Sequence, residues 1–377
     1  MKKILMAEAL DFNYPLHVGN HQYAKIFANN NYKVLWLNPI YSNMIHYIDK
    51  DIYNERQKYH TNRITQVENN LFVYSPKSLI QYGNYPIFKS KLFNRLSIKY
   101  TIPNIKKVLK ENDFLDIDIL WLSFTKYYYL EEIVNYKKLI HRCSDDISGF
   151  KGVCKSMLYF EKKLIKKANT VFVTSKDLIE KKSVIRNDLI YLPNGVELIN
   201  FQRKKYIIPI EFRNRTNRKC IFVGALHNWI DIDLVRYCSK KLGNIEFYFI
   251  GPVDTDLNSL NDISNIYILD KKDYSEIPNY LYYSDVSIIP FKINNLTNSI
   301  TPVKLYEYMS VGLNVVSTNF KEMNYISSPA YIAKNYDEFC EYILQAIENK
   351  DKNREKNIKF AKENTWEKRF EEIKKYI

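Results

Sequence analysis

Short apolar runs alternate with stretches of helical periodicity along the whole chain. This alternation is typical of parallel sheets whose strands are joined by crossover helices. In the first half, the pattern predicts strands at residues 3–9, 33–38, 71–74, 118–123, 138–142, 170–173 and 189–192. Apolar side chains at helical spacing predict helices at residues 19–30 and 154–168. The first half is therefore expected to form one α/β unit.

A second series of strands follows a change in composition. Residues 193–197, PNGVE, predict a turn, and residues 202–219, rich in Lys, Arg and Asn, predict a linker or hairpin with no core of its own. The next apolar runs are KCIFVGAL, IEFYFIG, NIYIL, VSIIPF and NVVST, with helices expected near residues 231–242, 276–283, 304–311 and 336–348. This is the pattern of a second doubly wound unit.

The predicted fold class is thus α/β, with two Rossmann-like doubly wound domains. We place the N-terminal domain at residues 1–197 and the C-terminal domain at residues 198–355. Residues 356–377 predict a C-terminal helix that packs back towards the N-terminal domain. A chain of 377 residues, 46% hydrophobic and 26% charged, is long and apolar enough for two ordered domains.

Cysteine usage and hydropathy indicate the compartment. The five cysteines are odd in number and contain no C-x-x-C pair, so neither a disulfide framework nor a zinc site is indicated. Glu8 and Asp11 interrupt the first apolar run, which suits a buried strand better than a signal peptide. No run of about 18 apolar residues predicts a spanning helix. We expect a cytoplasmic protein whose membrane contact, if any, is peripheral.

The net charge of +14 requires an anionic partner or a solvated surface. Residues 77–110, here called the basic segment, contain eight Lys or Arg and no acidic residue. Tyr82, Tyr85, Phe88, Phe93 and Tyr100 interleave with these cations. The mixture suits an element in the headgroup zone of an anionic membrane. A solvated basic face over a packed helix is an equal alternative, and single-stranded nucleic acid is a third.

The most informative stretch is residues 288–318, because ligands bind beyond the carboxyl ends of strands in doubly wound sheets. A strand ends near Pro290, and Thr301-Pro302 lead into a helix that carries Lys304 and Glu307. Helix amides and a first-turn lysine suit a diphosphate, and a carboxylate one turn on can accept the ribose hydroxyls. Taken singly, these residues are also typical of a capped surface helix.

Here the chain resembles the GT-B glycosyltransferases, in particular bacterial ones of teichuronic acid and other surface-polysaccharide assembly. The matching motifs are PVKLYEYMSVGLNVVST, LPNGVE, FVGALHNW and TWEKRF, which together cover both domains. The resemblance implies two domains facing across a cleft, with the nucleotide sugar on the C-terminal domain and the acceptor on the N-terminal domain. It implies donor-binding residues at Gly224, Asp270, Tyr274, Ser299, Thr301, Pro302, Val303, Lys304 and Glu307.

One departure from the family bears on stereochemistry. Many retaining members carry two glutamates spaced E-x7-E, and this chain has Ser299 at the first position and Glu307 at the second. The departure is compatible with an inverting enzyme similar to the xanthan-type glucuronosyltransferase, in which a lysine occupies the position of Lys304. Whether this chain inverts or retains is left open, as is a catalytically silent relative that only binds sugar nucleotides.

An inverting displacement needs one carboxylate to take the acceptor's proton. Asp145 and Asp146 follow a predicted strand at its carboxyl end, and we predict that Asp145 is the base. One of the two is equally expected to cap the following turn. On the acceptor side we expect Gly19, Asn20, His21 and Arg142, with His17 as a further candidate; the glycine also fits a plain turn and the histidines plain surface positions.

No metal or other cofactor is expected. D-x-D strings, which bind a divalent cation in a different transferase fold, occur at Asp116/Asp118, Asp231/Asp233 and Asp254/Asp256. Three unrelated copies in one chain indicate that they arise by chance. A lysine and helix amides can carry the leaving-group charge instead. We predict transfer of a hexosyl or uronosyl unit from a UDP-sugar to a surface glycan or its lipid-linked precursor. The alternatives are a sugar-nucleotide epimerase and a nucleic-acid-binding protein, although the chain carries no recognisable nucleic-acid motif.

Overall fold

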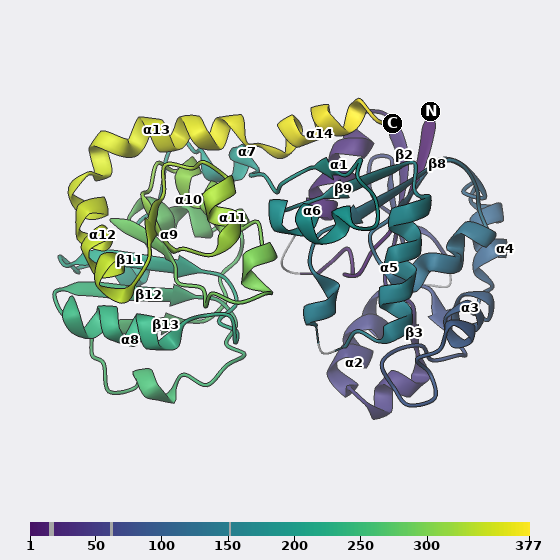
Figure 1. Ribbon diagram of the computed structural model, residues 1–377, viewed down its shortest axis with the longest axis horizontal. Coiled ribbons are helices and arrows are strands. Elements are labelled where there is room, and N and C mark those ends of the chain that lie inside the picture. The colour runs from purple at the N-terminus through teal and green to yellow at the C-terminus, as the bar shows by residue number, and fades with distance from the viewer. Residues whose placement is uncertain (15–18, 61–62, 151) are drawn as a thin grey trace. The chain divides into compact units, whose positions relative to one another are not determined.

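The computed structural model describes residues 1–14, 19–60, 63–150 and 152–377 (Figure 1). It separates into two compact units, Met1–Leu192 with Phe370–Ile377 (unit 1) and Pro193–Arg369 (unit 2). The division falls after Leu192, and the last eight residues of the chain count with the first unit. Each unit has its own sheet and its own apolar core.

Unit 1 is built on an eight-stranded sheet of order β10-β9-β8-β7-β1-β2-β5-β4. The strands are β1 Lys2–Ala7, β2 Tyr32–Leu37, β4 Thr65–Glu68, β5 Leu71–Tyr74, β7 Asp116–Leu122, β8 Asn135–Cys143, β9 Thr170–Val173 and β10 Ile190–Tyr191. All pairs are parallel except β4 with β5. Because β1 lies in the middle of this sheet, the residues after it lie at the centre of the carboxyl edge.

The crossover helices of unit 1 are α1 Gly19–Asn29, α2 Lys50–Tyr59, α3 Lys91–Lys99, α4 Ile105–Glu111, α5 Lys155–Lys167 and α6 Lys176–Ser183. A small sheet pairs β3 (Tyr41–Ser42) with β6 (Lys77–Ser78). The strands predicted for this half and the helices at 19–30 and 154–168 are confirmed to within a few residues. The alternation did not reveal β3, β4 and β6, because two-residue strands and the fully exposed β4 carry no apolar run.

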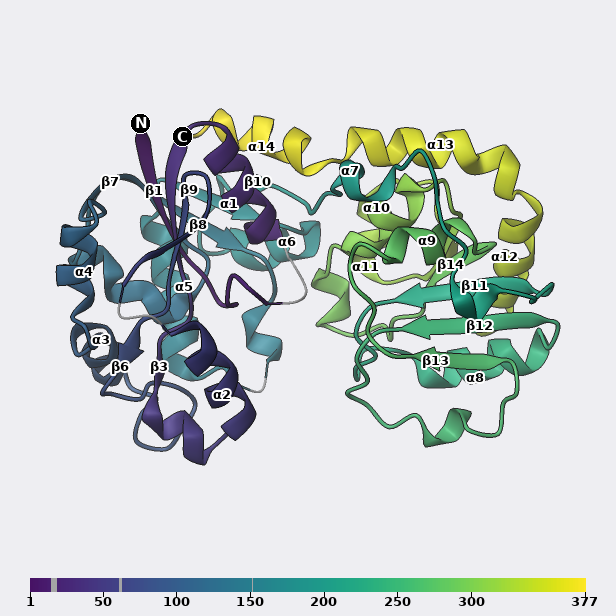
Figure 2. The same cartoon turned by 180° about the vertical axis from the view of Figure 1, so that it is seen from behind.

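Unit 2 has a six-stranded parallel sheet of order β13-β12-β11-β14-β15-β16, seen from behind in Figure 2. Its strands are β11 Arg218–Val223, β12 Ile245–Ile250, β13 Ile266–Leu269, β14 Val286–Ile289, β15 Val315–Thr318 and β16 Tyr331–Ala333. From β11 the strand order proceeds to β12 and β13 on one side and to β14, β15 and β16 on the other, so the order switches direction between β11 and β14. Doubly wound sheets bind ligands at such a switch point.

The helices of unit 2 are α7 Leu198–Phe201, α8 Ile232–Lys241, α9 Ile277–Tyr282, α10 Val303–Ser310, α11 Lys321–Tyr325, α12 Tyr336–Glu348 and α13 Lys350–Glu363. α8 packs against α12, and α10 packs against α7 and α13. The four helices predicted in this half correspond to α8, α9, α10 and α12. Residues 202–217 form no strand, as expected for a linker, but Phe212 is buried against Tyr248 and Tyr280 of the unit 2 core.

The C-terminal region differs from the single helix predicted at residues 356–377. The helix α13 already begins at Lys350 and ends at Glu363, and α14 spans Trp366–Lys374. The break has a local cause, since the Thr365 hydroxyl accepts a hydrogen bond from the amide of Lys368 (3.2 Å) and caps the new helix. Within the described residues, no helix is long and apolar enough to cross a bilayer.

Candidate active site

The first half of the candidate site lies at the amino end of α10 in unit 2. Lys304 is the second residue of this helix, and its ammonium lies 5.4 Å from the centre of the Phe222 ring at the end of β11. Burial lowers the pKa of Lys304, and the nearby Glu307 acts in the opposite direction. A diphosphate at this position would restore the charge that burial disfavours.

Gly224 makes this placement of Lys304 possible. It follows β11 with a φ of +141°, and a Cβ there would collide with the amine end of Lys304. Gly251, after β12, has a φ of +146°, and a Cβ at that position would collide with the Gly224 carbonyl. The two strand ends therefore need glycine both for their backbone conformation and for their close packing. The structure brings Gly224 and Lys304, which are 80 residues apart in the sequence, into direct contact.

Glu307 lies one turn further along α10. Its Oε1 accepts a hydrogen bond from the Tyr274 hydroxyl at 3.0 Å. Burial raises the pKa of Glu307, Lys304 and Tyr274 lower it, and the charge of Glu197 raises it again. Glu197, which precedes α7, is thus a second carboxylate near Glu307, and we had assigned it no role. Because 110 residues of chain separate the two glutamates, no sequence spacing could indicate this proximity.

The loop that carries Tyr274 is held from the α7 side. The Asn200 amide donates to the Tyr274 carbonyl (3.3 Å), and Arg203 donates to the Ser275 carbonyl (2.6 Å). The Phe201 and Tyr274 rings meet edge to face, 5.6 Å apart. Asp270 follows β13 directly and is exposed. Tyr274 thus contacts Glu307, whereas Asp270 makes no hydrogen bond to it among the described residues.

The turn before α10 is anchored by the LPNGVE motif. The Asn194 amide donates to the Thr301 carbonyl at 2.8 Å. Pro302 precedes the helix, and within the described chain no side chain caps the first turn formed from Val303 onwards. The leading amides of a helix have no intrahelical acceptor, so they can bind an anion. Ser299 is buried, and its hydroxyl donates to the Asn295 carbonyl (3.3 Å).

Asp145 and Asp146 lie after β8 in unit 1, in different environments. Asp146 caps the short helix Ile147–Gly149, accepting hydrogen bonds from the amide (3.2 Å) and hydroxyl (2.6 Å) of Ser148. It also pairs with Lys181 at 3.0 Å. Asp145 makes no hydrogen bond or ion pair among the described residues, and burial raises its pKa while Arg142 lowers it. Asp146 thus has the capping role, and Asp145 remains the candidate base.

A buried polar network adjoins Asp145. Arg142 is 2% exposed, and its guanidinium donates to Asn20 (3.3 Å) and to Ser144 (2.5 Å). Asn20 in turn donates to Glu8 at 2.6 Å. Burial raises the pKa of Glu8 to about 8, against opposing effects of Arg142, Ser123 and Asn20. Our site prediction did not include Glu8, although a carboxylate directly after the central strand is the signal that would have found it.

His21 and Gly19 do not join this network through any contact described here. His21 is fully buried, its Nε2 lies 3.1 Å from the Asp11 carbonyl oxygen, and its ring lies 4.5 Å from the Trp36 ring. Gly19 is the first residue of α1. His17 lies outside the described residues. Of the predicted acceptor-side residues, the structure therefore brings together Asn20 and Arg142.

Each D-x-D string has an aspartate that is bound to another residue of its own unit. Asp118 accepts from the Lys3 amide (2.8 Å), Asp231 caps α8 through the Leu234 amide (3.0 Å), and Asp254 pairs with His227 (3.0 Å). Among the residues that the structure describes, no group of three or more His, Cys, Asp or Glu side chains converges as in a metal site.

The chain has relatives among known proteins. Residues 217–349 match the family described as glycosyl transferases group 1. This range contains every predicted donor-binding residue, from Gly224 to Glu307. The putative teichuronic acid biosynthesis glycosyltransferase TuaH of Bacillus subtilis is 24% identical over 283 residues, covering 68% of this chain and 71% of the relative.

Solved structures resemble the whole chain. Sucrose-phosphate synthase from Thermosynechococcus elongatus has a TM-score of 0.69 at 11% identity, covering 100% of this chain and 98% of that one. HepE of Anabaena, in complex with UDP and glucose, has a TM-score of 0.66 at 12% identity, covering 100% and 99%. At such identities the likeness shows the fold, and it confirms the expectation of two Rossmann-like domains.

Proposed function

We propose that this chain, which is a glycosyltransferase of the GT-B fold, moves a hexosyl or uronosyl unit from a UDP-sugar to a surface glycan or its lipid-linked precursor. The observation that carries the proposal is the cluster of Lys304, Glu307 and Tyr274 at the amino end of α10. The complex of HepE with UDP and glucose supports the donor class, and the TuaH relative supports the acceptor class. The family match does not favour an epimerase or a nucleic-acid-binding protein.

Unit 2 would bind the donor through groups with distinct tasks. The leading amides of α10 and the Lys304 ammonium bind the diphosphate, because both place positive charge on the same anion. Glu307 accepts the ribose hydroxyls, with Tyr274 holding one of its oxygens. The loop of residues 270–274 receives the base. As the sugar leaves, the same cation and amides stabilise the charge that develops on the diphosphate, so no divalent cation is required.

Unit 1 would supply the base. In an inverting displacement the acceptor oxygen forms a bond to the anomeric carbon while the bond from that carbon to the diphosphate breaks. The acceptor's proton passes to the Asp145 carboxylate, whose raised pKa makes it a stronger base than an exposed aspartate. Arg142, held by Asn20 and Ser144, keeps a positive charge beside this carboxylate.

We also propose that the basic segment binds an anionic membrane surface. Its α3 exposes Lys91, Leu92, Arg95 and Lys99 on one side, and Leu79 and Ile87 in the preceding loop are more than 60% exposed. Tyr82 is excluded from such contact, because its side chain is buried and bonded to Ser156 (2.8 Å). Exposed apolar side chains beside cations suit the headgroup region.

The decisive measurement for the donor site is thermal stability with UDP, GDP, ADP and CMP. At about 100 Kd of UDP the native state gains about 2.7 kcal/mol, which raises Tm by about 5–10 °C for a unit of this size. Lys304→Ala should abolish the shift, whereas Lys359→Ala, which removes an exposed lysine of α13, should leave it unchanged. If the Lys304→Ala protein keeps the full UDP shift, the assignment of the donor site to α10 is wrong.

A further inference from the structure

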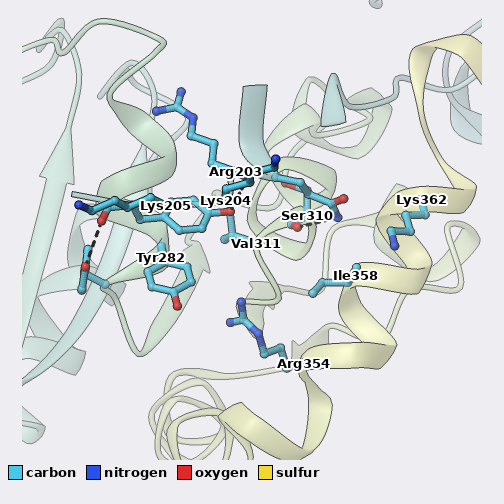
Figure 3. Close-up of a pocket in the computed structure, with 12 residues that line it drawn as sticks. Arg203, Lys204, Lys205, Tyr282, Ser310, Val311, Arg354, Ile358 and Lys362 are labelled. Atoms are coloured by element: carbon cyan, nitrogen blue, oxygen red, sulfur yellow. Dashed lines mark hydrogen bonds between the residues drawn. The ribbon is translucent and has the colours of Figure 1, made fainter. Parts of the chain in front are cut away.

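Unit 2 contains a second candidate site, a cavity of about 610 Å³ at the carboxyl end of α10 (Figure 3). Residues 202–206, the ends of α9 and α10, and one face of α13 line it. Lys304 lies in the first turn of α10 and Ser310 ends this helix, so the cavity lies about 9 Å further along the helix than the donor lysine. It is therefore separate from the donor-binding cluster. We call it the basic pocket.

The basic pocket is lined by cations without acidic partners. Within the described part of the chain, no Asp or Glu lines it. Arg203 is used elsewhere, since its guanidinium binds the Asn200 and Ser275 carbonyls and points away from Arg354 in Figure 3. The other basic side chains, Lys204, Lys205, Arg354 and Lys362, form no ion pair with any described carboxylate. Four basic side chains thus line one cavity without an ion pair to a carboxylate in the described part of the chain.

The position of Arg354 is built into the fold. Gly312 has a φ of +84°, and a Cβ there would collide with the side-chain stem of Arg354. The Arg354 guanidinium lies 5.4 Å from the centre of the Tyr282 ring. That ring stacks on Tyr206 with centres 4.0 Å apart. The floor of the pocket is therefore preorganised, which favours binding because less conformational freedom is lost.

The spacing of the cations indicates the kind of ligand. Arg354, Ile358 and Lys362 recur every fourth residue and project from one face of α13 towards the cavity (Figure 3). Arg354 and Lys362 are eight residues apart, so their Cα atoms lie about 12 Å apart along the helix. A ligand with anionic groups spaced along a chain, and an uncharged part beside Ile358, matches this separation better than a single phosphate does.

We propose that the basic pocket binds an anionic glycan chain carrying carboxylate or phosphate groups. The inference rests on the proposed function, because it assigns a second binding place to an acidic acceptor or product. A single strand of nucleic acid is also a spaced polyanion, but its binding relies on open aromatic platforms for base stacking. Here Tyr206 and Tyr282 stack on each other and Arg354 covers Tyr282. Tyr283 also lines the pocket, and its ring meets the Tyr282 ring edge to face, 5.2 Å apart, so the three tyrosines pack on one another.

The test uses the full-length protein and a fluorescent short oligogalacturonate, with binding followed by anisotropy. Lys205→Glu/Lys362→Glu should weaken binding by at least about tenfold, because both lysines line the pocket and their replacement puts negative charge beside an anionic ligand. The matched control, Lys352→Glu/Lys356→Glu, makes the same charge change with two exposed lysines about 200° around α13 from Arg354. It should change affinity by less than about twofold. A neutral maltooligosaccharide should not compete.

Three results would overturn the proposal. The wild-type protein fails to bind oligogalacturonate, both double variants weaken it equally, or single-stranded DNA of the same charge binds the pocket more tightly than the glycan. The UDP thermal shift, measured on the same proteins, separates this inference from the proposed function. Both double variants should keep the wild-type shift, which also shows that they fold. Absence of the shift in the wild type would reject the donor site and leave the result on the pocket intact.

Discussion

Two contacts between individual residues carry most of the chemistry proposed for this enzyme. In unit 2, Lys304 reaches the end of β11 only because Gly224 has no side chain. In unit 1, adjacent aspartates differ because Asp146 caps a turn and pairs with Lys181, whereas Asp145, the proposed base, forms no hydrogen bond or ion pair with a described residue. The difference between the aspartates can be tested by the same conservative substitution at each position.

Asp145→Asn should reduce sugar transfer by about 100-fold or more, because an amide cannot accept the acceptor's proton. UDP should still raise Tm as it does in the wild type. Asp146→Asn is the matched control, and it should keep activity and the cap, since Asn caps as well as Asp, while losing at most about 1 kcal/mol of stability with the Lys181 ion pair. Radiolabelled sugar transfer and thermal denaturation measure the two effects. Undiminished turnover by Asp145→Asn would end the assignment.

The affinity for UDP should depend on pH in both directions. Burial lowers the pKa of Lys304, so the ammonium that binds the diphosphate is lost at a lower pH than in a free lysine. Burial also raises the pKa of Glu307, so the carboxylate that accepts the ribose hydroxyls is protonated at a higher pH than usual. Calorimetric titration over pH should give a maximum, and Glu307→Gln should remove only the decline on the acidic side. A flat profile would contradict both roles.

At the scale of elements, α10 is the part on which the donor site depends. Asn194 holds the turn before it, and the Tyr308 hydroxyl binds the Val223 amide (2.8 Å) and carbonyl (3.2 Å) at the end of β11. At its far end, the Gln202 amide donates to the Ser310 carbonyl (3.2 Å). Because both ends are fixed, the first turn of α10 is preorganised for an anion, and the carboxyl end of the same helix borders the basic pocket.

The amino end of α10 should replace a metal ion in catalysis. Its amides and Lys304 supply positive charge to the leaving diphosphate, so the rate of transfer in EDTA should equal the rate without EDTA. Initial rates of transfer with EDTA, and again after addition of Mg²⁺ or Mn²⁺, measure this directly. Complete dependence on added metal would show that the helix and lysine do not suffice.

For the whole molecule, the net charge of +14 sets the kind of partner it attracts. Part of this charge surrounds the anion sites proposed for unit 2. Another part belongs to the basic segment, where Arg95 pairs with Glu132 (2.8 Å) but Lys99 and Lys106 remain exposed without a described ion pair. The two surfaces predict different ligands, and each can be removed without the other.

Vesicles that contain anionic lipid should sediment the protein at low salt, and neutral vesicles should not. Lys99→Glu/Lys106→Glu should reduce the bound fraction several-fold, because each cation near the surface contributes about 1 kcal/mol. Lys352→Glu/Lys356→Glu, with the same charge change in unit 2, should bind as the wild type does. Equal sedimentation of all three proteins would reject the basic segment as the membrane-binding surface.

The amino-acid sequence alone predicted the fold class, most of the strands, about half of the helices, and the enzyme class. Buried parallel strands need apolar runs and crossover helices need amphipathic periodicity, so both leave a record in the local pattern. The motif around Lys304 and Glu307 could be found in the same way, because the residues of one helix turn are neighbours in the chain. Some of the strands missed have no such record, such as β4, whose residues are all exposed.

Only the tertiary structure decided which distant residues meet. Glu197 comes close to Glu307, Gly224 passes beneath Lys304, and Glu8 joins Asn20 and Arg142, each across a long stretch of chain. The sheet order, rather than local sequence, sets these contacts. The same reason explains why the basic pocket could not be foreseen, since its cations belong to residues 202–206 and α13. Local patterns record what a segment buries, and the packing of the elements determines what it contacts.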